Sequence, residues 1–316
     1  MSTGYKAFEK GMICKDKQYK ENTTYEENGN EICKAGVMHY CENPFDVLNY
    51  YPLIDENGNM SEFAEVEPLG EVYKDEDKSA TNKLHIGAKL EFKNFVKTCI
   101  DFIVKEAKIS KRGNPAQIAN SGGYVQIASS RNSAQISSSG HSVQIGSSGK
   151  FAQIASSGND VKIVNNGIAA QIANSGDDTQ IGNSGSYVRL ASSGYAAKIV
   201  SSGNYSRIAN SGDYSQIISS GNFTKVVSNG DDAKITSKGK HSVIMATGYN
   251  SMAKAKVGSF ITLVEWEFVY VEDEGDLCWI PKCVKTEYVD GERIKEDVFY
   301  KLENGEFVEV VQKSER

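Results

Sequence analysis

Residues 170–178 read AQIANSGDD, one copy of the nine-residue unit that decides the fold of this chain. An isoleucine, leucine or valine returns at every ninth position, which gives fifteen consecutive copies. A glycine stands four residues after each of these positions, with Arg131 as the one exception. A short, fixed period predicts an architecture in which each unit stacks on its neighbours. The repeated apolar positions are Ile118, Ile127, Ile136, Ile145, Ile154, Ile163, Ile172, Ile181, Leu190, Ile199, Ile208, Ile217, Val226, Ile235 and Ile244.

Each unit contains one short strand and one turn. In AQIA (170–173) small, polar and large apolar side chains alternate, which is typical of a β-strand. The following NSG (174–176) is a turn sequence, and we expect its glycine to adopt a positive φ that other residues avoid. A helix is excluded, because each interior glycine costs about 1 kcal/mol relative to alanine. Stacked copies therefore predict a mainly β protein built on a parallel β-solenoid.

Either two or three of these units could close one coil of the solenoid, giving coils of about 18 or about 27 residues. The residue after each core position alternates between larger side chains, such as Val164 and Val200, and alanine, such as Ala155 and Ala173. This alternation favours two units, or about 18 residues, per coil and two facing sheets. About seven and a half coils, at a strand spacing of about 4.8 Å, would form a rod about 36 Å long.

The residue before each core position is almost always long and polar, and strand alternation directs it outward. We expect these side chains to stack into ladders, joined by tyrosines in the later units. The ladders could simply solvate a sheet face, or they could form a recognition surface, since Tyr and Arg are enriched in interface hot spots. The candidate binding residues are Gln171, Gln180, Arg189, Lys198, Arg207, Gln216, Tyr187, Tyr205 and Tyr214.

Two other uses of a β-solenoid are disfavoured by the repeat. Calcium-binding rolls need GGxGxD in every turn, whereas aspartate is sporadic here, as at Asp177 and Asp213. Residues 116–250 hold ten Lys/Arg and six Asp/Glu, a net charge of +4. That charge argues against an acidic DNA mimic, and it is too small to predict binding of nucleic acid. We predict no cofactor and no metal for the solenoid.

The rest of the chain is acidic, since all 316 residues together carry a net charge of −6. We expect four parts: an α+β N-terminal domain (1–87), a capping helix with a linker (88–115), the solenoid (116–250), and an antiparallel β C-terminal domain (251–316). The two outer parts would act as caps, because the open ends of a solenoid expose unpaired strand edges.

In the N-terminal part, short strands are predicted at Tyr5–Phe8 and Phe63–Glu67. A helix with Pro44 in its first position should run through Tyr51, and Lys74–Lys83 should be an exposed loop. A second helix, near residues 88–107, would cover the first coil as a lid. Its expected apolar face is Phe92, Phe95, Val96, Cys99, Phe102 and Ile103.

In the C-terminal part, strands are predicted at Ile261–Tyr270 and Cys283–Val289. The dipeptides Asp290-Gly291 and Asn304-Gly305 are strong signals for two-residue hairpin turns between such strands. We expect a small meander that closes the last coil.

The six cysteines form no Cys-x-x-Cys pair, so reduced thiols are expected. A zinc site from Cys14, Cys33, Cys41 and His39 is the alternative, but the spacing matches no known knuckle. The N-terminus is polar, and no apolar run approaches the length that a membrane-spanning helix needs. We therefore expect a cytoplasmic protein without membrane association.

Outside the repeats, the chain contains four distinctive N-terminal segments, GYKAF (4–8), GVMHYCENP (36–44), NYY (49–51) and FAEVEPLG (63–70), and a tail from Trp266 onward. With these segments it resembles an uncharacterised domain common in bacteriophage and prophage proteins. The resemblance implies a phage or prophage origin and brings no established activity.

A second, weaker resemblance is to ADP-ribosyltransferase-like folds. The segments 36–41, 49–50 and 65–70 are similar to motifs of those folds in order and spacing. The resemblance implies that His39 or Tyr40 would line a nicotinamide pocket and that Tyr50 would stack on its ring. The chain departs from the pattern at its first strand and shows no marked catalytic glutamate.

These observations lead to three hypotheses about function. The first is a non-enzymatic, phage- or prophage-encoded scaffold whose solenoid and caps bind a host or defence protein. The second is an ADP-ribosyltransferase-like enzyme, or a binder of an NAD-related ligand, in the N-terminal domain. The third is a structural component of a virion or of another self-assembling body. The chain could be a monomer or a homo-oligomer.

Overall fold

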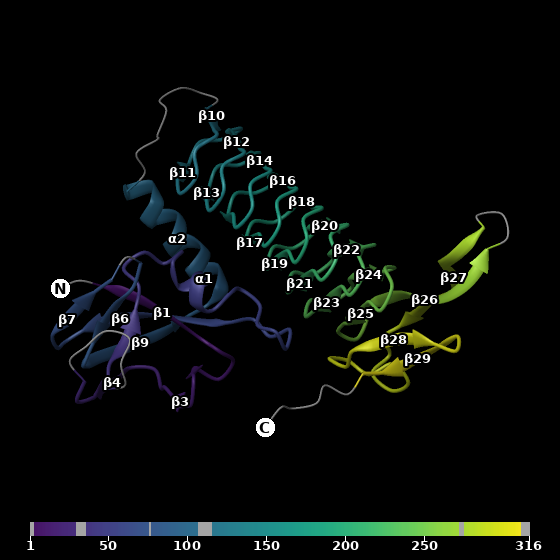
Figure 1. Cartoon of the computed structure of the whole chain (residues 1–316), viewed down its shortest axis with the longest axis horizontal. Helices are drawn as coiled ribbons and strands as arrows, with labels where there is room; N and C mark the ends of the chain where they lie inside the picture. The colour runs from purple at the N-terminus through teal and green to yellow at the C-terminus, as the bar shows by residue number, and fades with distance from the viewer. Residues whose placement is uncertain (1–2, 30–35, 76, 107–115, 272–274, 311–316) are drawn as a thin grey trace.

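The predicted fold class is confirmed. The computed structural model describes residues 3–29, 36–75, 77–106, 116–271 and 275–310. It consists of a parallel β-solenoid with an α+β region beside its first half and antiparallel strands at its far end (Figure 1). None of the helices in these residues is both long and apolar enough to cross a lipid bilayer.

Two ten-stranded sheets form the walls of the solenoid, and we call them the open sheet and the covered sheet. The open sheet contains β10 (Gln117–Asn120), β12 (Gln135–Ser138), β14 (Gln153–Ser156), β16 (Gln171–Asn174), β18 (Arg189–Ser192), β20 (Arg207–Asn210), β22 (Lys225–Ser228), β24 (Val243–Ala246), β26 (Phe260–Val271) and β27 (Asp276–Tyr288). The covered sheet contains β11 (Gln126–Ser129), β13 (Gln144–Ser147), β15 (Lys162–Asn165), β17 (Gln180–Asn183), β19 (Lys198–Ser201), β21 (Gln216–Ser219), β23 (Lys234–Ser237), β25 (Met252–Lys254), β28 (Tyr300–Glu303) and β29 (Glu306–Glu309).

The strand register fixes the length of the coil at two nine-residue units. Each strand pairs in parallel with the strand two units later, so that Gln171 lies beside Arg189 and Arg189 beside Arg207. The repeated apolar residues fill one continuous buried core between the sheets. Buried Asn and Ser side chains line the corners, where Asn183 Nδ2 donates to the carbonyl of Gly185 at 2.9 Å. The expected coil of two units is therefore confirmed, with its thin apolar core.

The expected role of the repeat glycines is wrong. Their φ angles are not positive; the left-handed residue lies two positions later, as at Asp178 after Gly176. A Cβ atom on Gly176 would instead stand 1.9 Å from the carbonyl oxygen of Gly158, one coil earlier. Glycine is needed because the corner backbones of successive coils touch. Arg131 stands in the first coil, and the position 18 residues before it, residue 113, lies outside the described residues.

The N-terminal region has two small antiparallel sheets, a hairpin and two helices. Its sheets have the strand orders β1-β6-β9-β4 and β5-β8-β7, and β2 pairs with β3. The elements are β1 (Gly4–Phe8), β2 (Ile13–Cys14), β3 (Lys17–Gln18), β4 (Thr23–Glu26), β5 (Met38–Tyr40), α1 (Val47–Tyr50), β6 (Glu62–Pro68), β7 (Val72–Lys74), β8 (Ser79–Thr81), β9 (Lys83–Leu90) and α2 (Phe92–Glu106).

The sequence predicts that helix α2 covers the first coil as a lid, and this prediction is wrong. The helix lies along the covered sheet, against β11, β13, β15 and β17 (Figure 1). Its apolar face differs from the prediction at two positions: Ile100 is fully buried, and Phe102 is only half-buried. Three of the four strands under the helix present a small residue to it, Ala128, Gly146 and Gly182. A Cβ on Gly146 would come within 2.7 Å of Ile103 Cδ1.

Two further expectations for this region need correction. Helix α1 has only four residues and begins after Asp46, so Pro44 precedes it and does not occupy its first turn. The segment expected to be an exposed loop, Lys74–Lys83, contains the buried strand β8 between β5 and β7. The run of charged residues at its start suggested a loop, and the pairing of β8 depends on β5, which is distant in the sequence.

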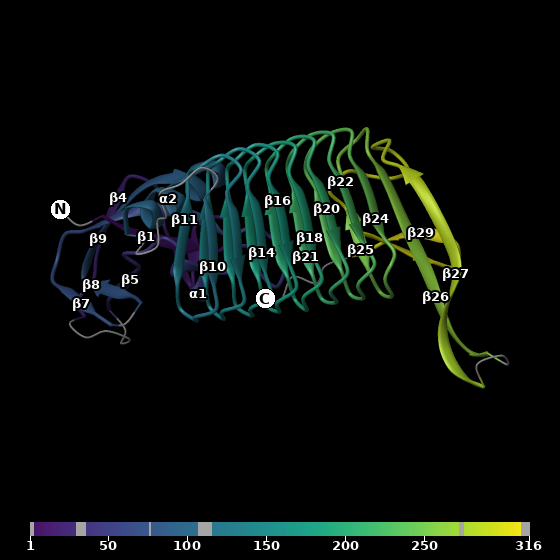
Figure 2. The ribbon, with the colours of Figure 1, turned by 90° about the horizontal axis from the view of Figure 1, so that it is seen from above.

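The C-terminal strands extend the solenoid sheets. Strand β26 continues the open sheet from β24 and then turns back as β27, and their outer part projects past the last coil (Figure 2). Asn304 and Gly305, both with positive φ, form the predicted hairpin between β28 and β29. Asp290 and Gly291 do not form a hairpin; Asp290 Oδ1 accepts backbone N–H groups of Glu292 and Ile294 in an irregular loop.

Candidate binding surface

The two faces of the solenoid differ in their surroundings. On the covered sheet, the residue after each core position is buried, as at Val164, Val200 and Ile218, because the N-terminal region packs on it. On the open sheet the equivalent residues are exposed, as at Ala173 and Ala191. The larger residues Val164, Val200 and Ile218 all lie on the covered sheet, where the N-terminal region packs. The open sheet is the surface available to a partner.

One ladder of long polar side chains runs along the middle of the open sheet. All of its members are the residues before the core positions, and those of β12 to β22 are exposed. Among them, Gln117 Nε2 donates to Gln135 Oε1 at 3.1 Å, so neighbouring rungs are linked. The ladder consists of Gln117, Gln135, Gln153, Gln171, Arg189, Arg207 and Lys225.

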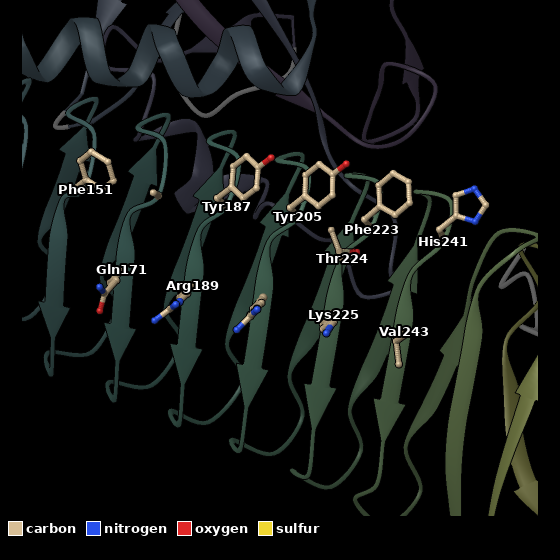
Figure 3. A pocket seen from close by; sticks show the side chains of 12 residues that line it. Phe151, Gln171, Tyr187, Arg189, Tyr205, Phe223, Thr224, Lys225, His241 and Val243 are labelled. Atoms are coloured by element: carbon tan, nitrogen blue, oxygen red, sulfur yellow. The ribbon is translucent and has the colours of Figure 1, made fainter.

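A ladder of aromatic rings stands beside it at the corner that precedes each of these strands (Figure 3). The ring centroids of Tyr187, Tyr205, Phe223 and His241 are 5.0, 5.1 and 5.2 Å apart, with interplanar angles of 5°, 6° and 19°. All four residues have positive φ, which is uncommon for bulky side chains. The ring faces are used in stacking on one another, so the ladder offers ring edges and tyrosine hydroxyls to a partner.

Between the two ladders lies a groove of about 670 Å³ that runs along the rod, across the strands (Figure 3). Its charge changes along its length. The early rungs carry neutral glutamine, and the later rungs carry Arg189, Arg207 and Lys225. The continuous aromatic stack also begins at Tyr187, level with the first of these cations. We call Arg189, Arg207, Lys225 and the rings from Tyr187 to His241 the cation–aromatic segment.

The three cations of this segment lie side by side on adjacent strands. Arg189 pairs in register with Arg207, and Arg207 with Lys225. No carboxylate of the described residues forms an ion pair with any of the three. Like charges on directly adjacent strands destabilise a sheet. An anionic partner would relieve this repulsion.

The nine candidate residues from the sequence do not form one surface. Gln171, Arg189, Arg207, Tyr187 and Tyr205 lie on the open side. Gln180, Lys198 and Gln216 belong to the covered sheet, and all three are half-buried.

Among these, Gln180 helps to hold the N-terminal region: it accepts the N–H of Leu53 at 2.8 Å and donates to the carbonyl of Leu48 at 3.1 Å. Tyr214 stands at the opposite corner, with its ring centroid 5.3 Å from that of Tyr195.

Phe223, His241 and Lys225 were not among the residues predicted from the sequence. Their signal was the same two-unit spacing from Tyr187 and Arg189, applied two and three coils further. The candidate residues were taken from every successive nine-residue unit, as if all units contributed to the same face. Because consecutive units fall on opposite sheets, only every second unit contributes to the open face.

The structure brings His39, Tyr40 and Tyr50 together at a separate cavity of about 660 Å³ in the N-terminal region. Burial, followed by the charge of Lys6, lowers the pKa of His39. Burial and a hydrogen bond to Asp77 raise the pKa of Tyr50. The only carboxylates that line this cavity in the described residues are Asp16 and Glu27, and Glu27 is paired with Lys17.

The alternative zinc site cannot be assembled from the residues that the structure describes. Cys33 lies outside them. Of the others, Cys14 accepts a hydrogen bond from the hydroxyl of Tyr51, and Cys41 is buried, which raises its pKa to about 12. No three metal-binding side chains of His, Cys, Asp or Glu converge within the described ranges.

The aspartates at the corners of the solenoid have a structural contact: Asp177 Oδ1 accepts the N–H of Tyr195 in the next coil.

Comparison with known proteins concerns only the first third of the chain. Residues 2–98 match the model of a domain of unknown function, DUF7666. No curated protein and no solved structure matches the chain. The matched segment runs from β1 into α2, so it contains the N-terminal cavity and most of the surface that docks on the covered sheet. The chain therefore contains a segment similar to an uncharacterised domain family, and the comparison assigns no activity to it.

Proposed function

We propose that this chain is a non-enzymatic interaction protein whose open sheet binds an elongated, acidic segment of a partner protein. The observation that carries the proposal is the cation–aromatic segment: three adjacent cations beside a groove that runs along the rod. The N-terminal region supports the assignment, because it occupies the opposite sheet and leaves this one exposed. A phage or prophage origin, a cytoplasmic location and a host or defence protein as partner are part of the proposal.

The groove suits an acidic polypeptide better than a nucleic acid. Single strands of DNA or RNA are held chiefly by stacking of bases on the faces of aromatic rings. Here the faces between Tyr187, Tyr205, Phe223 and His241 are occupied by the neighbouring rings, so that the stack leaves only its two outer faces. Carboxylates of an extended chain can instead reach the guanidinium groups, and its backbone can bond to the glutamine and tyrosine side chains.

Fluorescence anisotropy with a labelled oligo-glutamate peptide would test the proposal. The double variant Arg189→Gln/Arg207→Gln extends the neutral rungs through the site and should weaken binding about tenfold or more, which corresponds to about 1.4 kcal/mol or more. Arg131→Gln/Lys150→Gln removes the same charge at corners of the early coils and should bind like the original protein. Equal loss in both variants, or tighter binding of a single-stranded oligonucleotide than of the peptide, would contradict the proposal.

A second candidate function is supported by the N-terminal cavity. The three residues implicated by the ADP-ribosyltransferase-like resemblance, His39, Tyr40 and Tyr50, do line one cavity. We propose binding of an NAD-related ligand there as the alternative to a purely scaffolding role. Titration with NAD, followed by mass spectrometry for transferred ADP-ribose, tests both parts. Absence of binding, or the same affinity in a Tyr50→Ala variant, would remove this candidate.

A further inference from the structure

A buried amine faces the N-terminal cavity, and no predicted site residue accounts for it. Lys6 lies in the middle of β1 and is only 5 % exposed. It lines the cavity together with Cys14 from the β2–β3 hairpin and with Tyr19, Tyr50 and Tyr51. A lysine in the middle of a strand usually keeps its ammonium in water. This one is held inside the protein, beside an opening large enough for a small molecule.

Lys6 is held by a backbone carbonyl, a neighbouring thiol and two aromatic rings. Its Nζ donates to the carbonyl oxygen of His39 at 2.8 Å, and the Cys14 side chain lies close enough to be a second acceptor. The rings of Phe8 and Tyr19 have their centroids 5.6 and 5.4 Å from Nζ. An ammonium has three N–H donors, so one remains after the carbonyl and the thiol. That donor is available to a molecule in the cavity.

Two carboxylates, Asp16 and Glu27, line the cavity, but neither forms an ion pair with Lys6. No carboxylate of the described residues is within ion-pair distance of Lys6 Nζ, since Glu27 is paired with Lys17 at the rim of the cavity. Buried charges in proteins are ordinarily paired, because an isolated ion is costly to remove from water. Burial accordingly lowers the pKa of Lys6. An anion that enters the cavity would supply the missing partner.

The other walls define what kind of anion fits. Tyr19, Tyr50 and Tyr51 present aromatic surface, and the hydroxyls of Tyr50 and Tyr51 are already bonded to Asp77 and Cys14. These walls favour a flat apolar body, while Lys6 favours one carboxylate or phosphate group. A volume of about 660 Å³ accommodates a molecule of the size of a mononucleotide.

We propose that the N-terminal cavity binds a small organic anion with a planar body, whose carboxylate or phosphate oxygen is held by Lys6 Nζ. The ligand would lie with its planar part between the tyrosine side chains and its charge at the inner end of the cavity. This inference uses the same cavity as the second candidate function, but it requires neither NAD nor any group transfer.

Isothermal titration of the full chain with benzoate and with adenosine monophosphate would test the inference, with benzamide and adenosine as neutral counterparts. At least one anion should bind with one-to-one stoichiometry and at least tenfold more tightly than its counterpart. The variant Lys6→Met keeps the length of the side chain and should lose this preference. Lys20→Met, an exposed lysine outside the cavity, should retain it.

Three results would overturn the inference: neutral and charged members of a pair that bind equally, a Lys6→Met variant with unchanged affinity, or no binding of either anion. Circular dichroism verifies that Lys6→Met is folded, and Tyr50→Ala, at the exposed mouth of the cavity, gives a second variant that should weaken binding. A parallel NAD titration separates the two ideas. Anion binding without NAD binding supports the inference and removes the second candidate function.

Discussion

Substitution of one repeat glycine by alanine should show whether these glycines are needed for the local turn or for the close contact between successive coils. In Gly194→Ala the new Cβ would stand 1.9 Å from the carbonyl oxygen of Gly176 and 2.5 Å from its carbon. Gly194 does not have a positive φ, so alanine is not strained by its own backbone. The whole penalty must therefore arise from contact between successive coils.

The size of the penalty follows from how far the coils would have to separate. Ordinary contact with a Cβ begins at 3.4 Å, so the corner must open by more than 1 Å. The preceding residue, Ser193, resists this separation of the coils, because its N–H bonds to the carbonyl of Asn174 in the coil before at 3.0 Å. Such overpacking costs about 1–3 kcal/mol, against a gain of about 0.4–1 kcal/mol from the stiffer unfolded chain. We expect a net loss of about 1–2 kcal/mol.

Gly122→Ala is the matched control. Its Cβ would meet only Val125 and Asn120 side-chain atoms, at 3.6 and 3.7 Å, and this glycine also lacks a positive φ. The entropic gain remains, so the variant should be as stable as the original protein or up to about 1 kcal/mol more stable.

Urea unfolding followed by circular dichroism measures both variants. Tryptophan fluorescence reports separately on the end of the solenoid, where Trp266 Nε1 donates to the carbonyl of Thr247 at 2.9 Å and Trp279 lies against Tyr249. Equal destabilisation by the two substitutions would refute the reasoning, because it would mean that glycine serves the local turn in every unit. A stable Gly194→Ala variant would refute it as well.

Three further substitutions test other parts of the structure. Gly182→Leu should push the side chain into Phe92, already 3.3 Å from a Cβ at that position, and loosen α2 from the covered sheet; faster amide hydrogen exchange in α2, with little change in the open-sheet strands, is the expected readout. Lys6→Met should stabilise the protein at neutral pH, because burial holds the pKa of Lys6 below its ordinary 10.5. Since the unfolded chain binds the extra proton, stability of the original protein rises with pH between the two pKa values. The advantage of Lys6→Met in urea titrations should therefore shrink toward pH 10.5, and a constant difference would contradict this account. Asn304→Val places a β-branched residue at φ 52° in the β28–β29 turn, and a loss of about 1 kcal/mol is expected in thermal unfolding, while Asn304→Gly should be tolerated.

Much of the solenoid could be predicted because its signal is local and repeated. The nine-residue spacing predicts the strands, and the alternation of Val164 and Ala155 predicts two units per coil. The register of Gln171 beside Arg189 follows directly from that coil size. The hairpin at Asn304-Gly305 was also predictable, since its turn chemistry is contained in two residues.

The candidate surface was only partly predictable. Arg189, Arg207, Tyr187 and Tyr205 were identified from the pattern, and the structure places them together on the open sheet. Gln180 fitted the same pattern, yet it bonds to the backbone of the N-terminal region. Nothing within a nine-residue unit states which of the two sheets another part of the chain will cover.

Long-range contacts account for the remaining differences. The amphipathic pattern of α2 shows that one of its faces is buried, but it does not show against which surface. Likewise, Lys6 reads as an ordinary strand lysine, and its burial depends on Cys14, Tyr19 and His39, which arrive from separate segments.

The sequence by itself determined the repeat, favoured a coil of two units and predicted ladders of side chains, because each depends on residues at a fixed short spacing. The tertiary structure decided that α2 lies on one sheet, and so left Arg189, Arg207 and Lys225 exposed on the other. It also decided that the glycines serve contact between coils, as Gly194 and Gly176 show. The physical reason is the same in both cases. Steric fit between surfaces depends on atoms that are distant in the chain, and a local pattern does not specify which atoms will meet.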